Sequence, residues 1–235
     1  MMRKSAQAEY LATLNKISKA ITSDLYLEDI LKLIVTLTAS VMDAKICSLW
    51  LLDERNSTLK IRATQSMSEE YLKDRTLKVG EGIVGMVALD KQPIVIADVL
   101  ADKRYKEKKL AKQENLVSMA SVPMMIKNRV VGVINCYTTA AYNFSDNDIN
   151  LLSTIANQAA VAIENTELLV KAAVVQEELE TRKKVEKAKG ILMKSKGMSE
   201  DDAYNLMRKA SMDRRISLKE VAEAIILSYD IKGTL

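Results

Sequence analysis

The feature that most constrains the fold is a long stretch without helix-breaking residues. From Ser145 to Lys189 the sequence contains neither proline nor glycine, and Ser145 has Asp148 at the spacing of a capping box. Two rows of apolar residues recur there every seven positions: Ile155, Ala162 and Leu169, and Val161, Leu168 and Val175. We therefore expect one helix of several tens of residues that packs on the preceding domain and continues as a coiled-coil seam. A single solvated helix between two domains is the alternative.

The absence of histidine limits the chemistry that this chain can perform. Among its 235 residues there are two cysteines and no histidine. Histidine ligates haem and many metals, and it is the base in Ser-His and Cys-His hydrolases. The hydrophobic content of 48% is ample for a buried core. We therefore predict a globular protein that is not an enzyme, with no metal site and no cofactor.

Charge and hydropathy favour a cytoplasmic protein with no membrane partner. The chain carries 35 Lys and Arg residues against 31 Asp and Glu residues, so any basic surface must be local. Its apolar runs fall short of the roughly 18 to 20 residues that a membrane span needs, and its start does not resemble a signal peptide. Cys47 and Cys136 lie in apolar strand-like runs without C-x-x-C spacing, which favours buried thiols over a disulfide or zinc site.

The region before Ser145 is predicted to be an α+β domain. Apolar residues at helical spacing predict two helices between about residues 5 and 42. Two predicted hairpins follow, separated by a Gly-rich turn, a short helix and a strand after Pro93. The hairpins are "KICSLWLLD" with "TLKIRATQ", and the two arms of "SMASVPMMIKNRVVGVINCYTT", which turn at "KNR". Such hairpins with helices at both ends indicate a mostly antiparallel sheet flanked by helices.

The Gly-rich turn has the spacing of a dinucleotide-binding motif. "GEGIVG", Gly80 to Gly85, fits G-x-G-x-x-G, and Asp98 lies near the position of a ribose-binding acid. However, the following helix has room for only about two turns before Pro93, and no βαβ unit precedes it. We therefore predict a tight turn whose glycines allow positive φ and close helix packing, and no nicotinamide or flavin.

The C-terminal segment is predicted to form a small bundle of three helices. Gly197 is a natural C-terminal stop for the long helix. Ser199 with Asp202 and Ser217 with Glu220 have the spacing that caps two further helices.

Basic residues form two rows on the end of the long helix. At about 100° per residue, Val185, Ala188 and Leu192 form an apolar stripe. The first row borders this stripe and contains Arg182, Lys189 and Lys196; the second lies on a different face and contains Lys183, Lys187 and Lys194. Binding of phosphates needs several cations over a short span, and a merely solvated face is the alternative. We favour the first row because it borders the stripe that packs on the next helix.

At its separated motifs the first domain resembles the GAF domain family over about residues 25–165. The motifs are, in order, "VGEGIVGMVALDKQPIVIADV", "DKRY", "SMASVPM", "VVGVINCY" and "FSDNDINLLSTIANQAAVAIEN". The resemblance implies an antiparallel sheet with one face on the terminal helices and the other roofed by loops and short helices that can enclose a small molecule. Members sense cyclic nucleotides, bilins, haem, metabolites or redox state, and others are mainly dimerisation modules.

The GAF resemblance implies a pocket without identifying its ligand. By matching position, five residues would lie near its roof or floor: Asp98, Arg104, Tyr105, Ser118 and Met119. From the residues alone, Asp98 is equally well a turn cap and Met119 a core filler, and an empty pocket is the alternative. The Asn-Lys-Phe-Asp-Glu signature of cyclic-nucleotide-binding members has no counterpart, and no histidine is present to anchor haem.

The C-terminal segment resembles the ANTAR RNA-binding domain family over about residues 180–230. "AKGILM", "SEDDAYNLMRKAS" and "LKEVAEAI" have the spacing of the family and span all three predicted helices. The resemblance implies a dimeric module that binds paired hairpins in leader transcripts and lets transcription continue. Residues for RNA contact follow from the family lysine of "AKG", the cations near it and one aromatic ring. They are Lys187, Ala188, Lys189, Gly190, Lys196, Tyr204, Arg208, Lys209, Arg214 and Arg215.

We predict four parts: an N-terminal helix (1–24), a GAF-like sensory domain (25–165), a helical coiled-coil connector (166–181) and an ANTAR-like RNA-binding three-helix bundle (182–235). The predicted function is a signal-responsive antiterminator that binds leader RNA as a homodimer through the helix 145–184. An unknown small molecule or protein partner would act on the GAF-like domain. A DNA-binding regulator with a GAF sensory domain and a thiol-based redox sensor or enzyme are the alternatives.

Overall fold

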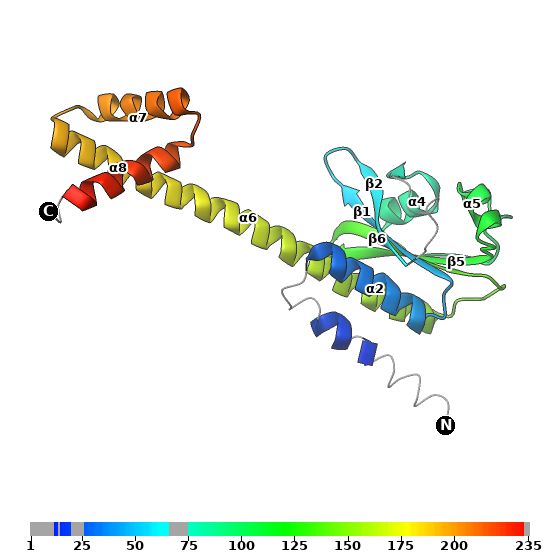
Figure 1. Ribbon diagram of the computed structural model, residues 1–235. Helices are drawn as coiled ribbons and strands as arrows, with labels where there is room; N and C mark the ends of the chain where they lie inside the picture. The colour runs from blue at the N-terminus through cyan, green and yellow to red at the C-terminus, as the bar shows by residue number, and fades with distance from the viewer. Residues whose placement is uncertain (1–11, 14, 20–25, 66–74, 233–235) are drawn as a thin grey trace. The chain divides into compact units, whose positions relative to one another are not determined.

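The computed structural model describes residues 12–13, 15–19, 26–65 and 75–232 (Figure 1). These residues divide into two compact units, with the boundary between residues 166 and 167. Of the first predicted helix, residues 12–13 and 15–19 are helical, and the remainder lies outside the described residues. The second predicted helix is α2, Leu27–Val41. No helix among the described residues is long and apolar enough to cross a membrane.

The first unit is built on a six-stranded antiparallel sheet. The strand order is β3-β2-β1-β6-β5-β4, and every neighbouring pair is antiparallel. The strands are β1 (Ile46–Asp53), β2 (Thr58–Thr64), β3 (Thr76–Lys78), β4 (Ile94–Ile96), β5 (Ser118–Ile126) and β6 (Arg129–Thr138). The two predicted hairpins are β1–β2 and β5–β6, and the second turns between Ile126 and Arg129. The predicted α+β class is therefore confirmed.

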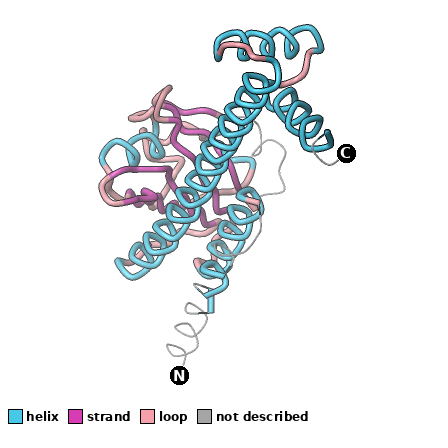
Figure 2. The backbone as a smooth tube through the Cα atoms, turned by 90° about the vertical axis from the view of Figure 1, so that its left-hand side faces the viewer, coloured by secondary structure: helices cyan, strands magenta, loops and turns pink. Residues whose placement is uncertain are grey.

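Each face of the sheet is covered by its own helices (Figures 1 and 2). Successive side chains of β1 point to opposite faces of the sheet. On one face, Leu49 packs with α2 and the start of α6 (Asp146–Lys196). Trp50 points to the other face, where α4 (Gly82–Asp90) supplies Ile83, Val84 and Val87. The short helix α5 (Lys108–Gln113) joins the same cluster. The sheet is therefore buried on both sides.

The Gly-rich motif forms the tight turn that precedes α4. Gly80 and Gly82 have φ of +84° and +61°, a region that side chains with a Cβ rarely adopt. At Gly85 a Cβ atom would lie 2.4 Å from the carbonyl oxygen of Lys78 and 2.9 Å from the amide nitrogen of Gly80. The motif therefore serves backbone packing, and α4 ends at Asp90, before Pro93.

The second unit is a bundle formed by the end of α6, α7 (Glu200–Arg214) and α8 (Leu218–Lys232). The predicted long helix is confirmed as one helix from Asp146 to Lys196, and Gly197 follows with φ of +65°. The predicted caps are also present. The amide of Asp202 donates to Ser199 Oγ (3.2 Å), and the amide of Glu220 donates to Ser217 Oγ (3.2 Å).

Replacing Gly85 by alanine is expected to destabilise the first unit by about 1–3 kcal/mol, because the new methyl group has no room beside two backbone segments. Trp50, the chain's single tryptophan, is buried in this unit, so its fluorescence during urea denaturation reports the loss.

Gly190→Ala is the matched control for Gly85→Ala. A methyl group there meets no atom within 4 Å and lies inside a helix, so the bundle should gain roughly 1 kcal/mol while the Trp50 transition stays unchanged. A Gly85→Ala protein with the parent's midpoint would contradict the packing argument.

Candidate nucleic-acid interface

The apolar stripe at the end of α6 is the centre of the bundle. Val185, Ala188 and Leu192 are at most 7% exposed. They pack against α7 and α8 through Ala203, Met207, Val221 and Ala222. The row of Arg182, Lys189 and Lys196 therefore borders a helix interface, whereas Lys183, Lys187 and Lys194 are all exposed on a different face of α6.

Lys189 is held inside the bundle by two carboxylates. Its side chain is only 9% exposed, and its Nζ lies 2.9 Å from Glu186 Oε1 and 2.6 Å from Glu200 Oε1. The hydrogen bonds to Glu186 and then Glu200 raise the pKa of Lys189, and the bond from Lys189 lowers the pKa of Glu200. Because Glu200 begins α7, Lys189 joins α6 to the first turn of the next helix.

Ala188 and Gly190 differ in their access to a ligand. Ala188 is fully buried among the core residues of the bundle, so a direct RNA contact at its side chain would require the helices to separate. The position of a Cβ on Gly190 is open, with no atom within 4 Å. Of these two expected contacts, the structure leaves Gly190 accessible.

Six expected RNA-contacting cations are exposed: Lys187, Lys196, Arg208, Lys209, Arg214 and Arg215. Among the described residues none of the six has an ion-pair partner. Sequence reasoning left Lys183 and Lys194 out of the expected contacts, although they share the face of Lys187. The sequence could have indicated this, because Lys183 and Lys194 lie four and seven residues from Lys187, which is the spacing of residues on one helix face.

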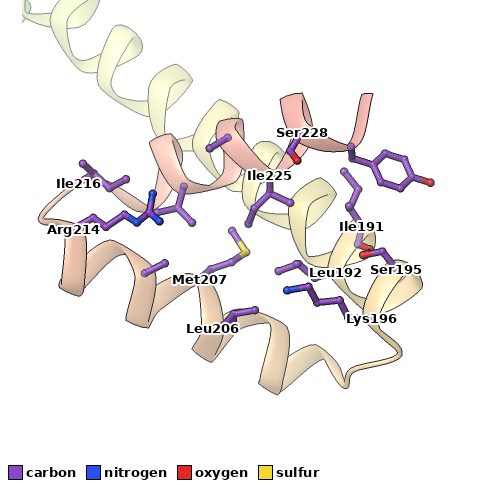
Figure 3. A pocket seen from close by; sticks show the side chains of 14 residues that line it. Ile191, Leu192, Ser195, Lys196, Leu206, Met207, Arg214, Ile216, Ile225 and Ser228 are labelled. Atoms are coloured by element: carbon purple, nitrogen blue, oxygen red, sulfur yellow. The ribbon is translucent and has the colours of Figure 1, made fainter. Parts of the chain in front are cut away.

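Two open grooves lie on the bundle. The first has a volume of about 460 Å³, runs between α6, α7 and α8, and includes Lys196, Arg214 and Tyr229 in its lining (Figure 3). The second, about 600 Å³, is lined in part by Tyr204, by the carboxylates of Glu177, Glu178 and Glu186, and by the cations Arg182 and Lys219. Tyr204 is 42% exposed, as a stacking ring requires, but more carboxylates than cations line its groove.

In the first unit, three of the five expected pocket residues have local structural partners instead of lining a common pocket. Asp98 Oδ1 accepts hydrogen bonds from the amides of Leu100 (2.8 Å) and Ala101 (3.2 Å), so it caps a turn. Arg104 is paired with Asp102 at 2.6 Å. The hydroxyl of Ser118 donates to the carbonyl of Ala97 at 2.7 Å.

Tyr105 and Met119 do come together, at a small cavity under α4. Both are buried, and Tyr105 meets the ring of Tyr137 edge to face at 6.3 Å. The cavity has a volume of about 20 Å³, close to what one water molecule needs. A ligand larger than water would therefore have to displace side chains that now fill this face, among them Trp50.

The two cysteines are neighbours in the sheet, although they lie far apart in the sequence. Cys47 and Cys136 are both fully buried and lie opposite each other in the β1–β6 pairing. Their sequence separation hid this pairing, because only the strand register brings them together. Burial, with a smaller effect of Cys136, raises the pKa of the Cys47 thiol, which disfavours the reactive thiolate.

Comparison with protein families assigns both parts of the chain. Residues 25–164 match the GAF domain, and residues 173–226 match the ANTAR domain. The two matches occur in the predicted order, and the second begins within the helix that precedes the bundle.

Relatives and solved structures agree with these matches. The transcriptional regulatory protein PdtaR of Mycobacterium tuberculosis is 32% identical over 155 residues, which are 63% of this chain and 73% of the relative. The Nif-specific regulatory protein of Herbaspirillum seropedicae is 24% identical over 203 residues, 81% of this chain and 37% of the relative. The GAF domain of an Acinetobacter phosphoenolpyruvate-protein phosphotransferase is 26% identical, with a TM-score of 0.60 over 69% of this chain and 97% of that domain.

We expect Lys189→Gln to weaken the attachment of α7, which hydrogen exchange at the first amides of α7 would report. Lys187→Gln removes an exposed cation from the same helix and should leave this exchange unchanged.

The effect of Glu200→Gln should depend on pH. Because the pKa of Glu200 is lowered by folding, its contribution is present above about pH 4.3, the ordinary value, and is lost as pH falls through the folded value. Parent and variant should therefore differ in thermal midpoint at pH 7 and converge in stronger acid. A difference that persists at low pH would contradict the ion pair.

Proposed function

The chain belongs to the GAF domain family and carries a C-terminal ANTAR domain, and we propose that it is a cytoplasmic RNA-binding regulator that promotes transcription antitermination. The observation that carries this proposal is the set of six exposed cations without ion-pair partners on the part of the bundle that the structure describes. A family match at the same residues supports it, as do two relatives named as regulatory proteins, one of them transcriptional. The proposed target is a pair of hairpins in a leader transcript.

The six cations suit a phosphate backbone because, in the described part of the chain, no carboxylate is paired with them and would have to be displaced by a phosphate. Each phosphate that a lysine or arginine neutralises releases counterions and adds salt-sensitive affinity. Lys187 can do this directly, and Lys183 and Lys194 extend its row. Lys189 would first have to leave Glu186 and Glu200, so its direct contact is costly, and we assign it the role of positioning α7.

Sequencing the RNA that copurifies with the full chain tests the function and identifies the target. Enrichment of leader segments with paired hairpins is expected. A recovered hairpin that duplex DNA displaces as readily as unlabelled hairpin would favour the DNA-binding alternative. Absence of any enriched RNA would contradict the proposed function.

Lys187→Gln should weaken binding to a recovered hairpin and reduce the slope of log affinity against log salt by about 1. Lys171→Gln provides the matched control, because Lys171 is an exposed lysine of α6 outside the bundle. An unchanged slope for Lys187→Gln would remove this lysine from the interface.

The middle of α6 supports the proposed homodimer. Every residue from 167 to 180 is exposed, although an isolated helix of that length is marginal in water. Leu168, Val175 and Leu179 are 53%, 64% and 46% exposed. They are spaced by seven and four residues, which places them on one face of the helix, as in the seam of a coiled coil. A second copy in the same register would bury them. The other predicted row, Ile155, Ala162 and Leu169, cannot form the dimer seam along its whole length, because Ile155 and Ala162 are buried in the first unit.

Dimerisation would also couple the two kinds of domain. Two bundles on one dimer can hold two hairpins, and tethering raises the effective concentration for the second. We propose that a ligand or protein partner at the GAF domain changes the pairing of the helix 145–184 and thereby the RNA affinity. The small cavity under α4 favours a protein partner or a ligand that opens this face.

Replacing Leu168 and Val175 together by glutamate should shift the full chain from dimer to monomer in sedimentation equilibrium, because like charges would face each other across the seam. Val170→Glu is the control, since Val170 is 60% exposed but lies on a different face. A Leu168/Val175 variant that remains a dimer would contradict the seam.

A further inference from the structure

The groove between α6, α7 and α8 has an apolar floor, because residues of the bundle core also line it. Leu192, Met207 and Val221 form part of this floor and are each at most 6% exposed. Leu206 and Ile225 line the walls from opposite helices (Figure 3). At about 460 Å³ the groove falls in the range of small-molecule sites.

The charge of this groove is of one sign. Its charged lining residues are Lys196 and Arg214, which lie toward opposite ends (Figure 3). Neither has an ion-pair partner in the described part of the chain, and no carboxylate lines the groove. The other polar side chains of the lining are three hydroxyls, from Ser195, Ser228 and Tyr229. An occupant with an apolar or flat body and anionic groups at its ends would match this pattern.

The second groove has the opposite character and serves as an internal comparison. Tyr204 shares it with three carboxylates, from Glu177, Glu178 and Glu186, and with two cations, Arg182 and Lys219. Lys219 is already paired with Glu177 at 3.2 Å. Because carboxylates outnumber cations in its lining, this groove is less favourable for phosphate groups than the first. Of the two exposed tyrosines in the bundle, Tyr229 is the one in the groove that has cations and no carboxylate, whereas the sequence analysis chose Tyr204.

We propose that this groove receives unpaired bases from the loop of an RNA hairpin, with the flanking phosphates at Lys196 and Arg214. The proposal rests on the proposed RNA-binding function and deepens it. Bases have flat apolar faces that leave water when they stack on an aromatic ring, and loop bases are free to be splayed out. Tyr229, 47% exposed, supplies the ring, and Leu206 supplies the apolar wall.

The test separates the bases of a loop from its phosphates. A pool of RNA hairpins with one fixed stem and a randomised loop is passed over the full chain, and a retained hairpin is sequenced. It is then remade with single abasic nucleotides in the loop, which keep every phosphate. Affinities for the parent protein, Tyr229→Ala and Tyr204→Ala are measured by fluorescence anisotropy, with circular dichroism as the check on folding.

We expect an abasic nucleotide at one or two loop positions to weaken binding about tenfold. Tyr229→Ala should weaken binding of the intact hairpin by a similar factor and should then be insensitive to the same abasic positions. Tyr204→Ala should remain within about twofold of the parent. Leu206→Gln, at a partly exposed wall position, repeats the test if Tyr229→Ala does not fold.

The proposal would be overturned if the abasic nucleotide weakened the affinity of Tyr229→Ala and Leu206→Gln by the same factor as that of the parent protein. The base would then bind outside this groove. A loss confined to Tyr204→Ala would overturn it in favour of the second groove. If no hairpin of the pool is retained, the proposed RNA-binding function itself fails, and this inference fails with it.

Discussion

One helix supplies part of two separate apolar cores. Near its start, Leu152 and Ile155 pack against the sheet, and near its end, Ala188 and Leu192 pack against α7 and α8. The residues between these packed segments have no core of their own. Backbone hydrogen bonds alone stabilise such a stretch weakly, so its exposed leucines and valines are the feature that most requires an explanation. A second copy of the helix provides one without any further element.

The bundle contains both a buried lysine in ion pairs and lysines that are exposed on its surface. Lys189 is enclosed by carboxylates from its own helix and from α7, whereas Lys187, two residues earlier, is exposed. A buried cation without partners is very costly, so the two glutamates are a condition for its position. Ala188 and Ala203 are fully buried in the core of the same bundle. Fixed helix positions in turn determine where the remaining cations lie.

Local signals predicted most of the fold, because their physical causes are local. The alternation in β1 and β2, the glycines at positive φ and the Ser199 and Ser217 caps each depend on a few neighbouring residues. The strand register that joins Cys47 to Cys136 depends on residues far apart in sequence, so spacing could not reveal it.

The candidate site was predicted less completely than the fold. Sequence pattern identified the cations near Gly190, and the helical spacing of Glu186 and Lys189 was a usable sign of an ion pair. Glu200 comes from the next helix, so the burial of Lys189 could not be read from the same pattern. The grooves require all three helices in place, which is why the sequence pattern could not place Tyr229 in one groove with Lys196 and Arg214.

The short strands β3 and β4 have a consequence for self-association. They border the sheet in the described part of the chain, and each contains three residues. An unpaired strand edge is a template on which another chain can add a strand, and its reach depends on its length. These borders offer little such template, so uncontrolled growth of sheet from copy to copy is disfavoured. In the proposed dimer, contact between copies would therefore fall to helices, whose side chains can specify a partner and a stoichiometry.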